Sequence, residues 1–165
     1  KGEPGEICVR SPLVMKEYYK LPEQTAEAFS GGWMHTGDVG RIDDEGFLYI
    51  VDRTKDMIVT GGFNVFPREV EDIISTHQAV AQVAVIGVPS EQWGEEVKAV
   101  IVLRADTKES EQLSQEIMAL VKQAKGSVQS PKSIDYVAGI PLTPVGKPDK
   151  KALRANYWQG QQRSV

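Results

Sequence analysis

Hydrophobic residues in the first third of the chain alternate with polar ones, a spacing that is typical of β-strands. Residues 7–9, 39–42 and 47–51 follow this pattern. The run Asp43-Asp44-Glu45-Gly46 joins the last two segments, and its glycine can take the left-handed conformation that a tight hairpin needs. Residues 23–29 are expected to form a short helix. The first third is therefore predicted to be rich in β-structure.

After about residue 66 the spacing changes to helices that alternate with buried strands. Pro67 is expected to start a helix, because its missing N–H has no partner in a first helical turn. A second helix begins at the N-cap Ser110 and ends at Gly126. Apolar runs predict strands at 57–59, 80–88, 97–103 and 134–137, and a last helix at 149–157. The order βαββαβ with a helical tail predicts an α+β fold, a central sheet flanked by helices, preceded by a β-hairpin.

Composition and charge argue against several classes of function. The formal charge is −4, and residues 53–165 hold 14 Lys/Arg against 13 Asp/Glu, which leaves no basic excess for nucleic acid. No apolar run reaches the roughly 20 residues of a membrane-spanning helix. The single cysteine, Cys8, excludes an internal disulfide and is expected to be buried. With two scattered histidines it shows no zinc spacing, so no metal site is expected and the setting is predicted to be cytoplasmic.

Three short segments hold residues that could carry chemistry: Thr36-Gly37-Asp38, residues 52–71 and Gly146-Lys147. The first places a hydroxyl, an open backbone and a carboxylate in a turn at a strand edge, with His35 as a partner in that turn. The second contains a glycine pair that can take positive φ or lie against a ligand. Taken singly, each has a simpler explanation, as a capped strand end, a connection from strand to helix, or a solvated turn.

Taken in order, the motifs are TGD, then D-R-x-K-D-x-I-x-x-G-G-x-N-V-x-P-x-E-V-E, then P-x-T-x-x-G-K before a basic helix. This series resembles the closing third of the adenylate-forming superfamily, which includes acyl-CoA synthetases, adenylation domains of peptide synthetases and firefly luciferases. The resemblance covers residues 33–153 almost without a gap, and the opening GEICVRSPLVMKEYY is similar to the family's strand before TGD. GGFNVFPREVE and AVIGVPSEQWGEEVKAVIVL resemble the fatty and aryl acid ligases most closely.

The resemblance implies which residues contact the nucleotide. In the family the TGD aspartate holds the ribose hydroxyls of ATP, which places Asp38 and its neighbour Thr36 at the nucleotide, with Arg53 on the other side. Lys147 matches the lysine that bridges the carboxylate substrate and the α-phosphate during adenylation. Its charge would oppose the negative charge gathered at phosphorus, so Lys147 is the implied catalytic residue.

The resemblance also implies a moving lid. Lys55 matches the family's pivot, so residues 1–54 would be the β-rich end of an N-terminal AMP-binding domain and residues 55–165 a C-terminal lid domain. Gly61-Gly62 is similar to the loop that lines the pantetheine tunnel after the lid rotates, where a side chain would block the passage. Trp93 is expected to be a packing residue, with contact to CoA as the alternative.

The implied function is the C-terminal portion of an ATP-dependent acyl-CoA ligase, which forms an acyl-adenylate and then a CoA thioester, releasing AMP. ATP, magnesium carried by the nucleotide, coenzyme A and a carboxylic acid would serve the full-length enzyme. The opening GEPGEI lacks the regions of a signal peptide and reads as mid-chain structure, so we expect a fragment. The resemblance implies that the fragment is inactive alone, because the family's phosphate loop and acyl pocket lie outside it. Two alternatives stay open: a non-catalytic interaction or regulatory module, and the lid of an adenylation domain that serves a carrier protein.

Overall fold

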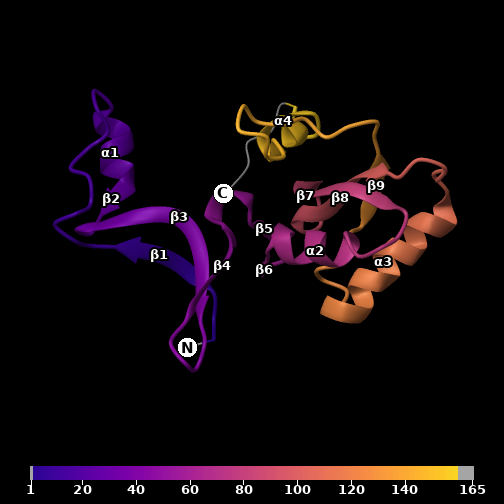
Figure 1. Cartoon of the computed structure of the whole chain (residues 1–165), viewed down its shortest axis with the longest axis horizontal. Coiled ribbons are helices and arrows are strands. Elements are labelled where there is room, and N and C mark those ends of the chain that lie inside the picture. The colour runs from indigo at the N-terminus through magenta and orange to yellow at the C-terminus, as the bar shows by residue number, and fades with distance from the viewer. Residues whose placement is uncertain (1, 160–165) are drawn as a thin grey trace. The chain divides into compact units, whose positions relative to one another are not determined.

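The computed structural model describes residues 2–159, and the chain divides into two compact units between Lys55 and Asp56 (Figure 1). The first unit contains a four-stranded sheet, and the second contains a five-stranded sheet. Within residues 2–159, no helix is long and apolar enough to cross a membrane. The predicted α+β class is confirmed.

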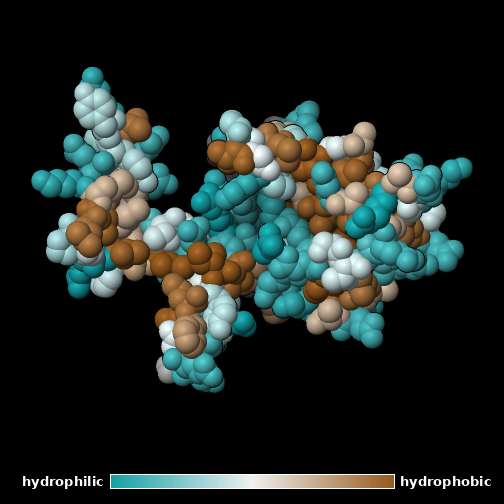
Figure 2. All heavy atoms as spheres, in the orientation of Figure 1, coloured by the Kyte–Doolittle hydropathy of each residue, from teal (hydrophilic) through white to brown (hydrophobic). Residues whose placement is uncertain are grey.

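In the first unit the central strand is β3 (Trp33–Ile42), which pairs antiparallel with each of the other three strands. These are β1 (Gly5–Val9), β2 (Phe29–Ser30) and β4 (Leu48–Arg53), and the helix α1 (Pro22–Ala28) precedes β2. The expected hairpin between β3 and β4 is present: Asp43 N–H donates to Phe47 O at 3.0 Å, and Gly46 takes a φ of +93°. Its exposed apolar side chains are Ile42, Phe47, Leu48, Tyr49 and Ile50. Figure 2 shows hydrophobic surface, coloured brown, in this part of the first unit.

The segment Thr36-Gly37-Asp38 lies inside β3, so the prediction that it forms a turn is wrong. Cys8 of β1 pairs with His35, whereas Glu6 pairs with Val39, so residues 36–38 lie opposite a single residue of β1. Gly37 takes a φ of +71°, which glycine adopts without the strain that a side chain would add. The segment is therefore a β-bulge, which re-aims the side chains on either side of the glycine.

The second unit builds a mixed sheet in the strand order β6-β5-β8-β7, with β9 parallel to β8 and the other pairs antiparallel. A single 3₁₀ turn, η1 (Thr54–Asp56), leads into it from β4. The elements are β5 (Ile58–Thr60), β6 (Phe63–Val65), α2 (Pro67–Ile74), β7 (Val80–Ser90), β8 (Gly94–Leu103), α3 (Glu111–Lys125), β9 (Ser133–Tyr136) and α4 (Lys150–Ala155). Ser110 caps α3 by accepting from Leu113 N–H, and Gly126 ends it, both as predicted.

Among the strands of the second unit, β6 is the one that the sequence did not predict. Gly61 and Gly62 have φ values of +56° and +84°, and they form a two-residue turn between the paired residues Thr60 and Phe63. Positive φ at both turn positions is typical of a type I′ hairpin. The glycine pair therefore closes a hairpin instead of leading directly into α2, and a strand of three residues is too short to show an alternating pattern.

Two hydrophobic clusters lie on opposite faces of the second unit's sheet, because alternate residues of a strand point to opposite sides. On β8, Val97, Ala99 and Ile101 pack in one cluster with residues of α2 and α3. Val100 packs in the other cluster with Leu153 of α4. Burying a leucine side chain typically contributes about 1.5–3 kcal/mol, so this apolar contact helps to hold α4 on the sheet. The contact thereby positions the loop that precedes α4.

Candidate functional site

The residues expected at the nucleotide lie together on β3 and β4. Asp38 pairs directly with Arg53, and Arg53 Nε donates to Asp38 Oδ1 across 3.2 Å. Thr36 Oγ1 donates to the backbone carbonyl of Ile7 at 2.8 Å and accepts from the backbone N–H of Asp38 at 3.1 Å. The Thr36 hydroxyl therefore links the bulge to β1 by a hydrogen bond. The bulge places the Asp38 carboxylate beside the Arg53 guanidinium.

The ion pair between Asp38 and Arg53 can be exchanged for a ligand at low cost. The two side chains are 30% and 58% exposed, and pairs that reach solvent typically contribute only about 0–1 kcal/mol. A carboxylate has two oxygens that can accept from neighbouring hydroxyls, and a guanidinium has five N–H donors. The arrangement can therefore bind a diol next to a group that carries negative charge.

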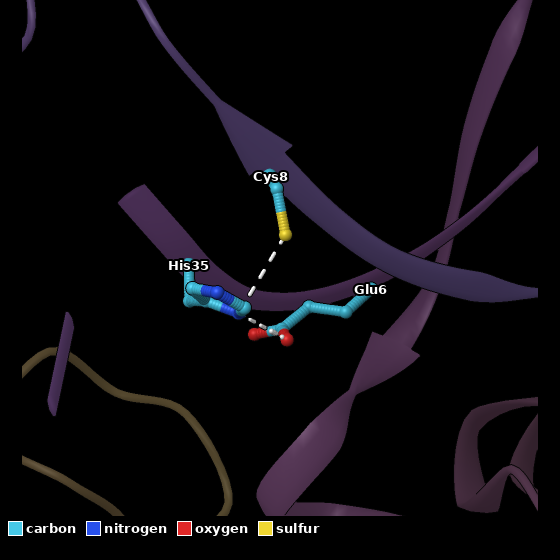
Figure 3. Close-up of side chains that lie close together, drawn as sticks. All are labelled: Glu6, Cys8 and His35. Carbon is cyan, nitrogen blue, oxygen red and sulfur yellow. Dashed lines mark hydrogen bonds and ion pairs between the residues drawn. The ribbon is translucent and has the colours of Figure 1, made fainter. Parts of the chain in front are cut away.

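A second carboxylate, which sequence reasoning missed, supports the bulge from β1. Glu6 Oε1 accepts from Gly37 N–H at 3.2 Å, and Glu6 Oε2 lies 2.7 Å from His35 Nδ1 (Figure 3). The partner of His35 is thus on β1 and not in a local turn. Cys8 Sγ lies 3.6 Å from the same ring nitrogen, and its side chain is exposed, so the prediction that Cys8 is buried is wrong. The reason is that in β1 all residues except Ile7 are exposed.

Lys55 lies at the last position of the first unit, within η1, and its side chain is exposed. The next residue, Asp56, is already fixed within the second unit. Its Oδ1 lies 2.9 Å from Arg154 Nη1 of α4, and the two side chains are only 17% and 12% exposed. The division between the units therefore falls within one 3₁₀ turn.

The two glycines of the β5–β6 turn differ in their surroundings. A Cβ on Gly61 would lie 2.7 Å from Trp93 Cε3, and Gly61 N–H donates to the backbone carbonyl of Trp93 at 3.0 Å. A Cβ on Gly62 would meet nothing within 4 Å. Trp93 therefore packs against the turn at Gly61, while Gly62 has open space beside it.

Lys147 ends a tight loop that leads into α4. Thr143 N–H donates to Lys147 O at 2.7 Å, Gly146 N–H donates to Thr143 O at 2.8 Å, and Leu142 forms a bridge with Pro148. Gly146 takes a φ of +77°, as expected for the glycine of a three-residue hairpin loop. The Lys147 side chain is exposed. The loop therefore holds the backbone in place while the ammonium group reaches solvent.

Helix α4 is tied to α2 by a buried ion pair. Lys150 Nζ lies 2.7 Å from Glu71 Oε1, and both side chains are 13% exposed. The same oxygen of Glu71 accepts from Val85 N–H at 2.7 Å. Removing one partner of a buried pair typically costs about 3–5 kcal/mol, because the other charge is left uncompensated. The helix that follows Lys147 therefore has a fixed position on the sheet.

The residues after α4 are tied to β9 and to the adjacent β8. Tyr157 OH donates to Asp135 Oδ2, and Lys98 Nζ lies 2.7 Å from Asp135 Oδ1. Burial raises the pKa of Asp135, but the hydrogen bonds from Lys98 and Tyr157 and the charge of Lys98 outweigh it, so this pKa lies below its usual value. Burial, followed by the hydrogen bond to Asp135, raises the pKa of Tyr157 to about 12.

We expect Tyr157→Phe to lower the free energy of unfolding at neutral pH, and we expect this destabilisation to decrease progressively at high pH. The folded-state pKa of Tyr157 is raised from 10.0 to about 12, so the folded protein holds the phenol proton more tightly. This stabilisation is complete below the unfolded-state pKa and is lost as the pH rises through the folded-state pKa. Urea denaturation of both forms at several pH values measures the difference in free energy of unfolding. A difference that stays constant up to pH 12 would argue against the Tyr157–Asp135 bond.

Comparison with known proteins places these features in a family. Residues 69–147 match the family described as the AMP-binding enzyme C-terminal domain. The medium/long-chain-fatty-acid–CoA ligase FadD8 of Mycobacterium tuberculosis is 58% identical over 169 aligned residues, which cover 100% of this chain and 30% of that protein. The fatty acid–[acyl-carrier-protein] ligase ScoC of Streptomyces coeruleorubidus is 36% identical over 99% of the chain and 31% of its own length. The ATP-bound RpMatB-BxBclM chimera B1 has a TM-score of 0.87 at 39% identity, covering 98% of this chain and 32% of its own.

These matches define the class of domain: residues 69–147 match the C-terminal domain of AMP-binding enzymes. This is the family that the TGD and glycine-lysine motifs of the sequence resemble. The chain spans about 30% of the length of the curated relatives it matches.

Proposed function

We propose that the chain is the C-terminal portion of an ATP-dependent acyl-CoA ligase. Lys147 carries the proposal: it is an exposed lysine on a loop closed by backbone hydrogen bonds, at the position of the family's adenylation lysine. A cation opposes the negative charge that develops at phosphorus, and the fixed backbone of the loop reduces the reorganisation needed to bring it there. The position of Lys147 before a firmly anchored helix supports this role.

In the proposed reaction, a carboxylate oxygen attacks the α-phosphorus of ATP, which yields an acyl-adenylate and pyrophosphate. The thiol of coenzyme A then attacks the acyl carbon and releases AMP. Asp38 accepts hydrogen bonds from the ribose hydroxyls, Arg53 assists beside it, and Thr36 holds the bulge that carries Asp38. Magnesium accompanies the nucleotide and neutralises phosphate charge.

The proposed domains are residues 1–54, the end of an N-terminal AMP-binding domain, and residues 55–165, a lid that turns about Lys55. The division of the chain into compact units after Lys55 supports this boundary. The exposed apolar side chains of the β3–β4 hairpin support contact with the remainder of such an N-terminal domain, because grouped apolar surface typically marks an interface. In the thioester-forming orientation, Gly62 lines the route of the thiol.

The alternatives are disfavoured on specific grounds. A non-catalytic module would be under no chemical demand to keep Asp38, Arg53 and Lys147 together, and all three are present. A carrier-protein acceptor remains the second candidate, because ScoC is named for that acceptor. Coenzyme A is preferred because FadD8, named as a CoA ligase, is the more similar of the two. A reaction that consumes ATP and a free thiol also fits a cytoplasmic setting.

A chimera tests the proposal directly. This chain would replace the matching 30% of FadD8, and the product would be assayed with ATP, CoA and medium- and long-chain fatty acids. We expect the chimera to form acyl-CoA, and the 165-residue chain alone to release no pyrophosphate above background, since in the family the phosphate loop and the acyl pocket belong to the N-terminal domain. Turnover by the chain alone, or a folded chimera that binds ATP and releases no pyrophosphate, would overturn the proposal. Replacing CoA with acyl-carrier protein in the same assay decides between the two acceptors.

A further inference from the structure

We propose that Glu6, Cys8 and His35 form a binding site for one zinc ion at the junction of β1 and β3. Their ligand atoms, Glu6 Oε, Cys8 Sγ and His35 Nδ1, all lie within 4.8 Å of one another. Figure 3 shows the three side chains converging from two neighbouring strands. The proposed function leaves these three side chains unassigned.

The distances between the ligand atoms suit a tetrahedral ion. With Zn–S near 2.3 Å and Zn–N near 2.0–2.1 Å, tetrahedral angles place the sulfur and the nitrogen about 3.6 Å apart. Cys8 Sγ lies 3.6 Å from His35 Nδ1. The same reasoning requires about 3.3 Å between the nitrogen and a carboxylate oxygen. Glu6 Oε2 lies 2.7 Å from His35 Nδ1, so it must retreat by roughly 0.6 Å, which a rotation of its flexible side chain provides.

The strands bring these three residues together before any ion binds. Cys8 and His35 are directly paired residues of β1 and β3, and Glu6 is two residues before Cys8 on β1. The other oxygen of Glu6 is already held by Gly37 N–H, which orients the carboxylate. Ligands carried by paired strands lose little freedom on binding an ion, which favours affinity.

A proton relay through the histidine does not fit this geometry. A relay needs one ring nitrogen to donate to the carboxylate while the other accepts from the thiol. Here Cys8 Sγ and Glu6 Oε2 both contact Nδ1. A donor set in which a sulfur, a nitrogen and an oxygen converge on one point instead suits a metal ion.

The chemistry of the donors selects the metal. Thiolate and imidazole are ligands of Zn²⁺, whereas Mg²⁺ and Ca²⁺ bind oxygen ligands. Three protein ligands leave the fourth tetrahedral position to water. The bound ion would cross-link β1 to β3 next to the bulge at Gly37 that positions Asp38, and so would stiffen that bulge.

Cobalt and zinc titrations of the 165-residue chain, prepared free of metal and of any affinity tag, test the proposal. We expect one Co²⁺ per chain, with the near-ultraviolet absorption of a thiolate–cobalt bond and intense visible bands of tetrahedral coordination, and we expect Zn²⁺ to displace it. Cys8→Ser and His35→Gln should each weaken zinc binding by more than about 100-fold, since even outer partners of a metal site are worth about 10- to 100-fold.

The other histidine of the chain supplies the matched control. His77 lies in the second unit, where its Nδ1 accepts from Ala79 N–H, so His77→Gln should leave the cobalt spectrum and the zinc affinity unchanged. X-ray absorption of the zinc-loaded wild type needs no variant and should show one sulfur near 2.3 Å with nitrogen and oxygen ligands near 2.0–2.2 Å. Absence of sulfur from that shell, a cobalt spectrum that survives His35→Gln, or zinc binding that is lost with His77→Gln would overturn the site. None of these results depends on ligase activity.

Discussion

Lys147→Ala should slow acyl-adenylate formation by about 10²- to 10³-fold in the FadD8 chimera, the scale expected when one preorganised group that stabilises charge is removed. The loop that carries Lys147 is closed by backbone hydrogen bonds, so the substitution removes the ammonium group and leaves the backbone in place. Conversion of preformed acyl-adenylate to acyl-CoA should stay nearly unchanged, because that step does not use Lys147 in the proposed mechanism. Single-turnover assays of the two steps measure both rates.

Lys151 offers a matched control for Lys147. It is an exposed lysine in the first turn of α4, four residues further along the chain, and Lys151→Ala removes the same charge from the same region. We expect both steps to keep their rates in this variant. If Lys151→Ala slowed adenylation as much as Lys147→Ala, the effect would be one of general positive charge and the assigned role of Lys147 would fail.

Gly62→Leu should produce the reverse result, with acyl-adenylate accumulating while its conversion to acyl-CoA falls. A Cβ at position 62 meets nothing within 4 Å, so a leucine side chain would extend into the space through which the thiol is proposed to pass. Gly61 is unsuitable for this test because its Cβ would strike Trp93. Quantifying both products after mixing enzyme, ATP, fatty acid and CoA reports the effect.

Backbone strain at position 62 needs its own control, because Gly62 has a φ of +84°. Gly126 has a φ of +85°, and a Cβ there also meets nothing within 4 Å. Gly126→Leu therefore carries a backbone cost of its own at the end of α3, about 1–3 kcal/mol, because φ +85° with ψ 174° is a region adopted essentially by glycine alone. We expect this variant to lose stability and to keep the ratio of the two rates. An equal loss of thioester formation in both variants would assign the Gly62 effect to strain.

Local signals in the sequence predicted much of the second unit. Helix ends are marked by properties of single residues: side-chain capping at Ser110, positive φ at Gly126 and the missing N–H at Pro67. The apolar runs of β7 and β8 were long enough to read as buried strands. The three-residue strand β6 is too short for such a run, and the glycine pair alone predicts a connection into the helix.

Contacts between distant segments could not be predicted. The bulge at Gly37 depends on how β1 pairs with β3, and the sequence T-G-D alone resembles a turn. The exposure of Cys8 and its approach to His35 depend on the same pairing. Arg154 and Asp56 lie 98 positions apart, so their ion pair is visible only once α4 packs on the sheet. The motifs predict which residues form the site, and the pairing of strands determines what surrounds them.

The most direct test of the proposed ligase follows both intermediates in one rapid-quench experiment with the FadD8 chimera. Acyl-adenylate and acyl-CoA would be measured over time for the wild type, Lys147→Ala and Gly62→Leu. The account predicts opposite defects. Lys147→Ala lowers the amounts of both products because it slows the first step. Gly62→Leu raises the amount of acyl-adenylate and lowers the amount of acyl-CoA. If both variants slowed the two steps in the same proportion, a lid that serves each half-reaction through a different loop would be contradicted.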